Sequence, residues 1–300
     1  MIRVQHWDAF TIQPGTGNPA GIVLAAQGLS DDDMQATAAA VGFNDTAFVL
    51  PSKHADFCIR YFAPRREVEL CGHATIATFA ALYHAGLLPQ DKLRDGFTLE
   101  TRAGILPIEV QVTDVAPLII MNQGVASFVE FNGDHQALAN AMGIDARDFH
   151  PRLPIIYGST GRWTLLVPVT DLRVMQAMRP APEQFAAVLA DMSGASIHPF
   201  CLQTHDPRAQ PHARHFSSPA SGILEDAVTG TASGVLGAYY RRFIAQDPSY
   251  NSDKPLVMEQ GYEVDRPGSV QVWTQQRGEE CLVRIAGHAV FVREMQMPAA

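Results

Sequence analysis

Two long stretches without charged residues dominate the hydrophobic pattern of the chain. The first, residues 70–86, contains no Asp, Glu, Lys or Arg, and the second contains none from residue 227 to residue 240. A helix that is apolar all round has no solvent-facing side and must be buried. The pattern therefore predicts two buried helices. Gly86 suits a left-handed cap at the end of the first, and Arg241 and Arg242 suit the C-terminus of the second.

The same kind of segment precedes both predicted helices. An arginine, an aromatic residue, a phenylalanine and a nearby proline occupy residues 60–64 and again residues 214–219. A run of small residues then leads into each helix. The chain thus carries a weak internal repeat with a period near half its length. Two helix N-termini facing one cleft would attract an anion, because backbone N–H groups and the positive end of the helix dipole gather there.

The rest of the pattern predicts short strands and a few amphipathic helices. Strands are predicted at residues 3–10, 20–26, 46–50, 57–63, 97–102, 105–113, 118–124, 153–157, 163–169, 196–204, 212–218, 256–260, 270–275, 281–286 and 289–295. Helices are predicted from Ser30 to about Gly42, at residues 170–178 and at residues 182–192. The turn chemistry of residues 13–19 predicts a hairpin, with a wall of the binding cleft as its alternative role.

The length of 300 residues fits two domains of ordinary size. We place the N-terminal domain at residues 1–118, with the last strand, about residues 287–300, returning to it. The C-terminal domain then covers residues 119–286, and the active site is expected in the cleft between the two.

Composition narrows the class of protein. A hydrophobic content of 47% and a charged content of 18% describe a globular chain. The sequence has no unbroken apolar run of transmembrane length and begins with residues too polar for a signal-peptide core, so we expect a cytoplasmic protein without a membrane partner. A net charge of −9 with no basic run argues against nucleic acid.

Cysteine and lysine usage bear on redox state and cofactor. The four cysteines, Cys58, Cys71, Cys201 and Cys281, are scattered and are expected to be reduced thiols. Lysine occurs only three times, each time in a polar, loop-like context. Pyridoxal phosphate needs a lysine held in a site for its Schiff base, so that cofactor is not expected.

Acid–base groups collect at the predicted cleft. Asp45 lies among apolar residues, where partial burial would raise its pKa, although a turn-forming role is the alternative. His73 and Asp226 lie near the starts of the two buried helices. A histidine together with a carboxylate commonly carries out general acid–base catalysis. For Asp226 the alternative is a helix N-cap.

Backbone amides at the two helix starts would bind the substrate. The amides of Gly72 and His73, and those of Gly230 and Thr231, are placed to hold a carboxylate and an enolate-like charge. Thr229 lies beside the second pair.

Cys71 is a further candidate, since a thiol at a helix N-terminus has a lowered pKa. Racemases that need no cofactor use two thiols, one on each face of the α-carbon. The second helix start carries Thr229 and Thr231 instead of cysteine, and Cys201 and Cys281 are distant in sequence. A two-thiol racemase is therefore disfavoured.

A cluster of metal-ligand residue types lies within eighteen residues, namely His198, Cys201, His205, His212 and His215. The two pairs with i, i+3 spacing fall on predicted strands, where such residues point to opposite faces. We therefore expect no metal site, and no effect of metal removal.

Five groups of residues form motifs along the chain. They are Asp8-Ala9-Phe10 with Gly17-Asn18-Pro19-Ala20-Gly21, Asn44-Asp45-Thr46-Ala47-Phe48-Val49, Cys71-Gly72-His73-Ala74-Thr75, Glu225-Asp226-Ala227-Val228-Thr229-Gly230-Thr231-Ala232, and Glu259-Gln260-Gly261 with Arg266-Pro267-Gly268. These motifs resemble those of the phenazine-biosynthesis F-type (PhzF-like) isomerase family. They occur in the family's order and span nearly the whole chain.

The resemblance implies an α+β fold of two pseudo-symmetric diaminopimelate epimerase-like domains, each a curled, mainly antiparallel sheet around a central buried helix. It also implies a cofactor-independent, homodimeric isomerase acting on a small cyclic amino- or hydroxy-carboxylic acid by one-base proton transfer. The family's name-giving member isomerises trans-2,3-dihydro-3-hydroxyanthranilate.

The resemblance also assigns residues. The family's general acid/base, a glutamate, falls on Asp45, its histidine on His73, its aspartate on Asp226 and its elbow serine on Thr231, while Asn18 is expected at the substrate. Asp45 is one methylene shorter than the family glutamate, a reach of roughly 1.5 Å, and this difference leaves the substrate open.

Two alternatives remain. One is a lyase resembling the trans-3-hydroxyproline dehydratases of the proline racemase family, which pair a cysteine with a threonine, as Cys71 and Thr229 could, or an enzyme of the proline racemase type itself. The other is a non-catalytic protein that binds small acids in the same cleft.

Overall fold

The computed structural model describes residues 1–218, 223–245 and 253–298. The chain divides into two compact units, Met1–Asn122 together with Ala286–Ala300, and Gln123–Ile285. Pro219 and Gly222, which belong to the predicted lead into the second buried helix, lie outside the described residues. None of the helices in the described ranges is both long and apolar enough to cross a membrane.

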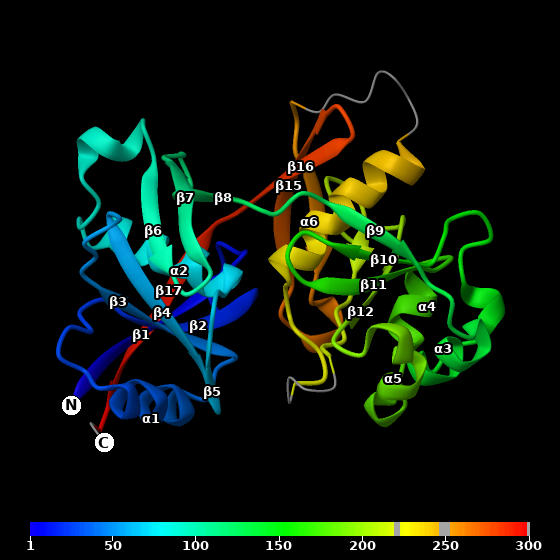
Figure 1. Ribbon diagram of the computed structural model, residues 1–300, viewed down its shortest axis with the longest axis horizontal. Coiled ribbons are helices and arrows are strands. Elements are labelled where there is room, and N and C mark those ends of the chain that lie inside the picture. Colours follow the sequence, from blue (N-terminus) through cyan, green and yellow to red (C-terminus); the bar gives the residue numbers. More distant parts are fainter. Residues whose placement is uncertain (219–222, 246–252, 299–300) are drawn as a thin grey trace. The chain divides into compact units, whose positions relative to one another are not determined.

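Strands of mixed direction form the first unit (Figure 1). They are β1 (Ile2–Ala9), β2 (Asn18–Val23), β3 (Asp45–Leu50), β4 (Phe57–Ala63), β5 (Arg66–Val68), β6 (Phe97–Thr101), β7 (Gly104–Gln111), β8 (Leu118–Asn122) and β17 (Ala289–Met297). Its helices are α1 (Asp31–Val41), α2 (Gly72–His84) and the short 3-10 helix η1 (Gln90–Leu93). Strand β1 pairs antiparallel with both β2 and β17, so the last strand of the chain lies beside the first.

Helix α2 is the buried helix that the apolar pattern predicts. It packs against β1, β2, β3, β8 and β17 (Figure 1), and every residue from His73 to Leu82 is buried. Gly86 adopts the left-handed conformation that ends the helical segment, with a φ of 68°. Burial of a whole helix surface fixes the position of its N-terminus, where the candidate chemistry lies.

Helix α1 begins and ends as its sequence predicts. The Ser30 hydroxyl accepts from the Asp33 amide, and the Asp33 carboxylate accepts from the Ser30 amide, which is a capping box. Gly42 closes the helix in the left-handed conformation. The chain then enters β3 at Asp45, so the capped end of α1 determines where that carboxylate emerges.

The second unit combines a sheet with a group of short helices. Its strands are β9 (Ser127–Glu130), β10 (Ile156–Ser159), β11 (Trp163–Pro168), β12 (Ser196–Cys201), β13 (His212–Ala213), β14 (Leu256–Gln260), β15 (Gly268–Arg277) and β16 (Glu280–Gly287), at whose end the chain returns to the first unit. Its helices are α3 (His135–Met142), η2 (Ala146–Asp148), α4 (Leu172–Ala177), α5 (Pro182–Val188), η3 (Ala190–Met192), α6 (Gly230–Tyr239), the π-helical turn η4 (Tyr240–Ile244) and η5 (Tyr262–Val264).

Helix α6 is the second buried helix, and it packs on β10 and β15. Nine of its ten residues are buried. A Cβ atom at Gly237 would lie 2.5 Å from the Val272 side chain, so only glycine allows this close approach. Arg241 and Arg242 follow in η4, at the C-terminal end where the sequence places them.

Two predicted elements are wrong in detail. The strand expected over residues 212–218 is limited to β13, and Phe216 makes only isolated bridges, to Ile197 and to Glu225. The strand predicted at residues 153–157 extends to Ser159, because Gly158 and Ser159 pair with β11 and also with β9. In both places the local side-chain pattern is a poor guide, since a pairing partner distant in sequence helps to decide where the strand ends.

The internal repeat is visible in side-chain contacts. The Arg60 guanidinium lies 5.1 Å from the Phe62 ring and makes two hydrogen bonds to the Glu67 carboxylate. Arg214 lies 5.0 Å from the Phe216 ring and makes the same paired bonds to Glu225. Each unit thus uses a stacked, bidentate arginine in front of its buried helix.

Candidate active site

The first elbow (residues 70–73) leads into α2. Cys71 is the N-cap residue, in an extended conformation with φ −135° and ψ 115°, and its side chain makes no capping hydrogen bond. A Cβ atom at Gly72 would meet no atom within 4 Å. The elbow therefore has open space at a helix N-terminus, which is suited to a bound anion.

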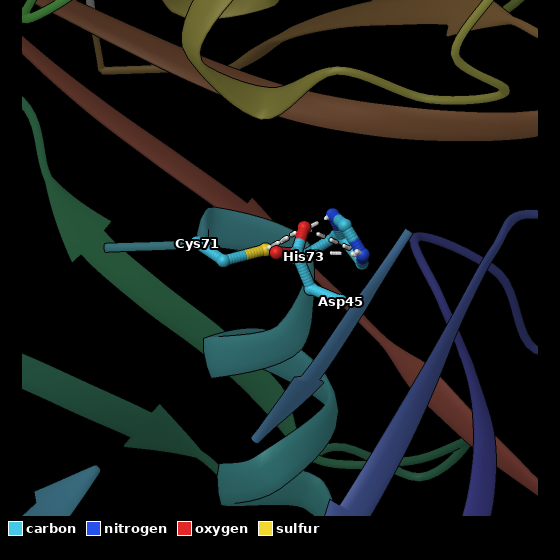
Figure 2. Close-up of side chains that lie close together, drawn as sticks. All are labelled: Asp45, Cys71 and His73. Atoms are coloured by element: carbon cyan, nitrogen blue, oxygen red, sulfur yellow. Dashed lines mark hydrogen bonds and ion pairs between the residues drawn. The ribbon is translucent and has the colours of Figure 1, made fainter. Parts of the chain in front are cut away.

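Three side chains that the sequence selected meet at this elbow (Figure 2). The Cys71 thiol donates to Oδ2 of Asp45 at 3.1 Å and lies 3.3 Å from Nδ1 of His73. Nε2 of His73 lies 4.0 Å from the same Asp45 oxygen. The Asp45 side chain is 15% exposed and that of His73 is 10% exposed. A carboxylate, a thiol and an imidazole thus share a mostly buried site that is still open to a ligand.

A buried hydrogen bond fixes the start of α2. The Thr75 hydroxyl donates to the Cys71 carbonyl at 2.7 Å and lies 2.6 Å from the Tyr61 hydroxyl. Tyr61 is fully buried on β4, and burial raises the pKa of its phenol well above the usual value. The neutral phenol can therefore hold the turn that carries Cys71 and His73.

The glycine-rich turn is the hairpin that its sequence predicts, and it places Asn18 near the same edge of the sheet. Ala9 pairs with Asn18 across the turn, and the fully buried Asp8 carboxylate accepts from the Gly15 amide at 2.8 Å. Strands β2 and β3 run parallel, with Ala20 opposite Asp45. Because Asn18 and Asp45 are the first residues of these neighbouring strands, both lie at their N-terminal ends.

The second elbow (residues 225–231) leads into α6 and is held by hydrogen bonds. The Thr229 hydroxyl donates to Oδ2 of Asp226 at 2.6 Å. The Gln260 side chain accepts from the Thr229 amide at 3.2 Å and donates to the Asp226 carbonyl at 2.7 Å. Thr229, not Asp226, is the N-cap residue, and its side chain makes no capping hydrogen bond. The N-cap role considered for Asp226 is therefore not observed.

A buried histidine pair lies directly beside the second elbow. The Asp226 amide donates to the His215 carbonyl, and Nδ1 of His215 lies 3.2 Å from Nδ1 of His198. Burial lowers the pKa of His215 to about 4, against an opposing effect of the Asp226 charge. Burial also holds the pKa of His198 well below its usual value. Both rings are therefore neutral near pH 7 and add no charge beside the elbow.

The thiols of the second unit are poorly suited to catalysis. Burial raises the pKa of Cys201 to about 12 and also raises that of Cys281. A buried thiol with a raised pKa is a weak nucleophile and a weak base. All four cysteines are thiols rather than disulfides.

The predicted site residues form two groups, one in each unit. Asp45, Cys71, Gly72 and His73 form one group in the first unit, with Asn18 on a neighbouring strand. Asp226, Thr229, Gly230 and Thr231 form the second elbow in the other unit.

Sequence reasoning missed two residues of these groups. Gln260 lies in the motif around residue 260, but no role followed from the motif. His215 was selected only as a metal-ligand candidate. The side-chain hydrogen bonds of Gln260 link a β14 residue to the second elbow, 31 residues away in sequence, and no local pattern signals such a contact.

Nearly the whole chain is similar to known proteins of one family. Residues 7–295 match the family model described as phenazine biosynthesis-like protein. The chain is 42% identical to an uncharacterized isomerase, YfhB, of Bacillus subtilis over 96% of each chain. It is 26% identical to the trans-2,3-dihydro-3-hydroxyanthranilate isomerase of Pseudomonas aeruginosa over 98% of each chain.

Solved structures agree with the fold. The crystal structure of a PhzF-family phenazine biosynthesis protein from Bacillus anthracis superimposes with a TM-score of 0.94 at 46% identity and 99% coverage of both chains. A hydroxyproline epimerase from Agrobacterium vitis, 12% identical, shares the fold with a TM-score of 0.63 over 99% of this chain and 90% of that one. The predicted α+β, epimerase-like fold class is thus confirmed. The chain therefore belongs to the phenazine biosynthesis-like family of PhzF isomerases.

Proposed function

We propose that this isomerase moves a proton between two carbons on one face of a small cyclic carboxylic acid, with Asp45 as its single base. One observation carries the proposal: the Asp45 carboxylate lies at an open helix N-terminus, beside a thiol donor at 3.1 Å and an imidazole at 4.0 Å. Taking a proton and returning it on the same face needs one base, whereas inverting a stereocentre needs two on opposite faces. The first elbow supplies one carboxylate of this kind.

In the proposed reaction Asp45 removes a proton from a substrate carbon and becomes a carboxylic acid. The electron pair of the broken C–H bond moves into the substrate's conjugated system and its carboxylate. Asp45 then returns the same proton to another carbon, and the double bonds shift accordingly. Amides of the first turn of α2 would stabilise the charge while it is spread over the substrate.

Cys71 and His73 would serve Asp45 rather than replace it. The thiol donates to Oδ2 of Asp45, and this bond would hold the carboxylate in one orientation. His73 lies close to the same oxygen and to the thiol, so it can position a polar group of the substrate. General base catalysis of this kind contributes about 10²- to 10⁴-fold in rate.

The second elbow would bind the substrate and would take no part in the proton transfer. Its carboxylate, Asp226, accepts the Thr229 hydroxyl, and a carboxylate suits an amine or hydroxyl of the substrate as a donor. The amides of Gly230 and Thr231, at the start of α6, suit a carboxylate. This division of labour is a proposal for each elbow taken by itself.

The hydrogen bonding of Thr229 disfavours the cysteine–threonine dehydratase. Its hydroxyl is committed as a donor to Asp226 at 2.6 Å. A dehydratase of that kind would have Thr229 act together with the Cys71 thiol, which itself donates to Asp45. Calorimetry with proline analogues is the direct test of this alternative, and tight binding of one would favour it.

The substrate is best sought among compounds like those of the characterised relative. We would assay purified protein with trans-2,3-dihydro-3-hydroxyanthranilate first, and then with other cyclic β-hydroxy and diene carboxylic acids, following the shift of the double bonds by absorbance. The proposal expects turnover of at least one of these acids by the natural chain and its loss in Asp45→Asn. Binding of acids without turnover of any would instead favour the non-catalytic protein.

We further propose that the enzyme works in the cytoplasm as a homodimer and without a cofactor. Light scattering of the purified protein tests the dimer. Activity after extensive dialysis against a chelator, followed by gel filtration, tests independence of a cofactor at this site.

A further inference from the structure

A second group of ligand-type side chains lies in the second unit, away from both elbow sequences. His205 follows β12, His212 is on β13 and Glu263 is in η5. One ligand atom from each of these residues lies within 4.8 Å of the other two. The argument that i, i+3 residues on a strand face apart does not apply here, because the three residues come from separate segments and β13 is only two residues long.

Two carboxylates contact the two ring nitrogens of His212. Nδ1 lies 2.9 Å from Oε1 of Glu259, and Nε2 lies 3.0 Å from Oε1 of Glu263. Backbone amides of His205 and Asp206 donate to the two Glu259 oxygens, at 2.7 and 2.8 Å, and fix that carboxylate. A histidine that donates Nδ1–H to a fixed carboxylate, with Nε2 directed at a cation, is the usual arrangement of a metal-bound histidine.

Glu263 has unused binding capacity. Its side chain is 8% exposed, and its Oε2 is buried without a hydrogen-bond partner among the residues that the structure describes. A buried carboxylate oxygen without a partner is costly, because its desolvation is not compensated. A cation bound between Glu263 and the two histidines would remove that cost.

A cavity gives access to this group. It has a volume of about 390 Å³ and is lined by Gln176, Arg179, His205, Arg214, Tyr262 and Glu263. Tyr262 stacks on the His205 ring at 4.2 Å, with an angle of 15° between the planes, and so limits its rotation. Because two of the ligand side chains line the cavity, a bound cation would keep a coordination position open toward it.

We propose that His205, His212 and Glu263 bind a divalent transition metal ion of the zinc class, with Glu259 as the carboxylate that orients His212. Two histidines and a glutamate with an open fourth position form a known type of zinc site. Ligand atoms of a tetrahedral zinc lie about 3.3 Å apart, as bond lengths near 2.0 Å require. The His212–Glu263 distance is already near this value, and the ligand atom of the exposed His205 lies within 4.8 Å of the other two.

A bound metal ion would lie between Nε2 of His212 and the Glu263 carboxylate, which are 3.0 Å apart. Glu259 precedes Gln260, the residue that holds the second elbow, so occupancy of the site would also brace that elbow.

The test uses the full chain, stripped with EDTA and dialysed. It is titrated with Zn²⁺ by calorimetry, its bound metal is counted by mass spectrometry, and Co²⁺ absorption reports the coordination number. We expect one equivalent of Zn²⁺, and at least about tenfold weaker binding in His205→Ala and in Glu263→Gln. Glu259→Gln should weaken binding by about 10- to 100-fold without removing a ligand. His54→Ala removes an exposed histidine elsewhere and should change nothing.

One control separates this site from the first elbow. Asp45, Cys71 and His73 also bring three ligand atoms within 4.8 Å of one another. Cys71→Ser should therefore retain the zinc equivalent. The proposal is overturned if the natural chain binds no stoichiometric zinc, or if Cys71→Ser loses the metal while His205→Ala and Glu263→Gln keep it.

Discussion

The N-termini of α2 and α6 share a backbone design but carry different chemistry. In both, an extended N-cap residue, Cys71 or Thr229, makes no capping hydrogen bond with its side chain and is followed by glycine. At α2 a carboxylate from a separate strand, Asp45, meets a thiol and an imidazole. At α6 the carboxylate of Asp226 comes from the elbow itself and accepts the Thr229 hydroxyl. Under the proposed function, the start of α2 would serve proton transfer and the start of α6 would bind the substrate.

The largest effect on activity is expected when Asp45 is neutralised. Asp45→Asn keeps the shape and removes the base, so we expect kcat to fall by about 10²- to 10⁴-fold. Cys71→Ser keeps a donor to the carboxylate and should cost less than about tenfold, the size of one hydrogen bond. Steady-state kinetics on the same acid compare the two, and the reverse ranking would mean a thiol mechanism.

The two arginine–glutamate pairs should differ in their contribution to stability. Arg214 and Glu225 are 6% and 10% exposed, so Glu225→Gln leaves a buried charge unpaired and should cost about 3–5 kcal/mol. Arg60 is 23% exposed and also contacts Asp31, so Glu67→Gln should cost about 1 kcal/mol. Urea unfolding of each variant measures the difference, and equal losses would contradict the assignment of burial.

The second elbow should respond to mutation through affinity. Asp226→Asn removes a charge proposed to bind the substrate, and we expect kcat/KM to fall by about 10- to 100-fold, mainly through KM. Thr229→Ser keeps the hydroxyl that donates to Asp226 and serves as the matched control. A large loss of kcat with unchanged KM would place Asp226 in the chemistry and erase the distinction between the elbows.

The second elbow should also be more sensitive to acid than the first. His198 and His215 are neutral in the folded state because burial lowers their pKa values, to about 4 for His215. The unfolded chain binds protons there below a pKa of about 6.5, so the free energy of unfolding decreases as pH falls from about 6.5 toward 4.

The expected slope is at most about 1.4 kcal/mol per pH unit for each histidine. Hydrogen exchange resolved by segment should show α6 opening before α2 over this range. His215→Asn should flatten the dependence, and an unchanged slope in that variant would contradict the explanation.

The sequence predicts best those features that depend on residues close together in the chain. The apolar run of α2, its glycine end and the two ends of α1, at Ser30 and Gly42, are local signals, and the structure confirms them. Asp45, Cys71 and His73 follow from two motifs, which mark the starts of β3 and α2. Strand β13 could not be predicted in its true length, because Phe216 pairs with residues of two other segments.

Contacts between residues that are distant in sequence explain what the sequence did not predict. Gln260 reaches the second elbow from β14, and His205, His212 and Glu263 converge from three segments. The histidines were visible in the sequence as a cluster, but their partner Glu263 lies about 50 residues further on, and Glu259 beside it orients the ring. The spacing argument concerned pairs along one strand, so it does not describe this group, whose members come from three segments.

The measurement that tests the central claim most directly is isotope transfer during turnover in deuterated water. With an acid that the enzyme converts, the product of early turnover is isolated, and the hydrogen content of the newly protonated carbon is determined by NMR and mass spectrometry. A single base at Asp45, shielded by its elbow, should return part of the original hydrogen to that carbon. Complete solvent deuterium at an inverted carbon, from the first turnover, would contradict the one-base account.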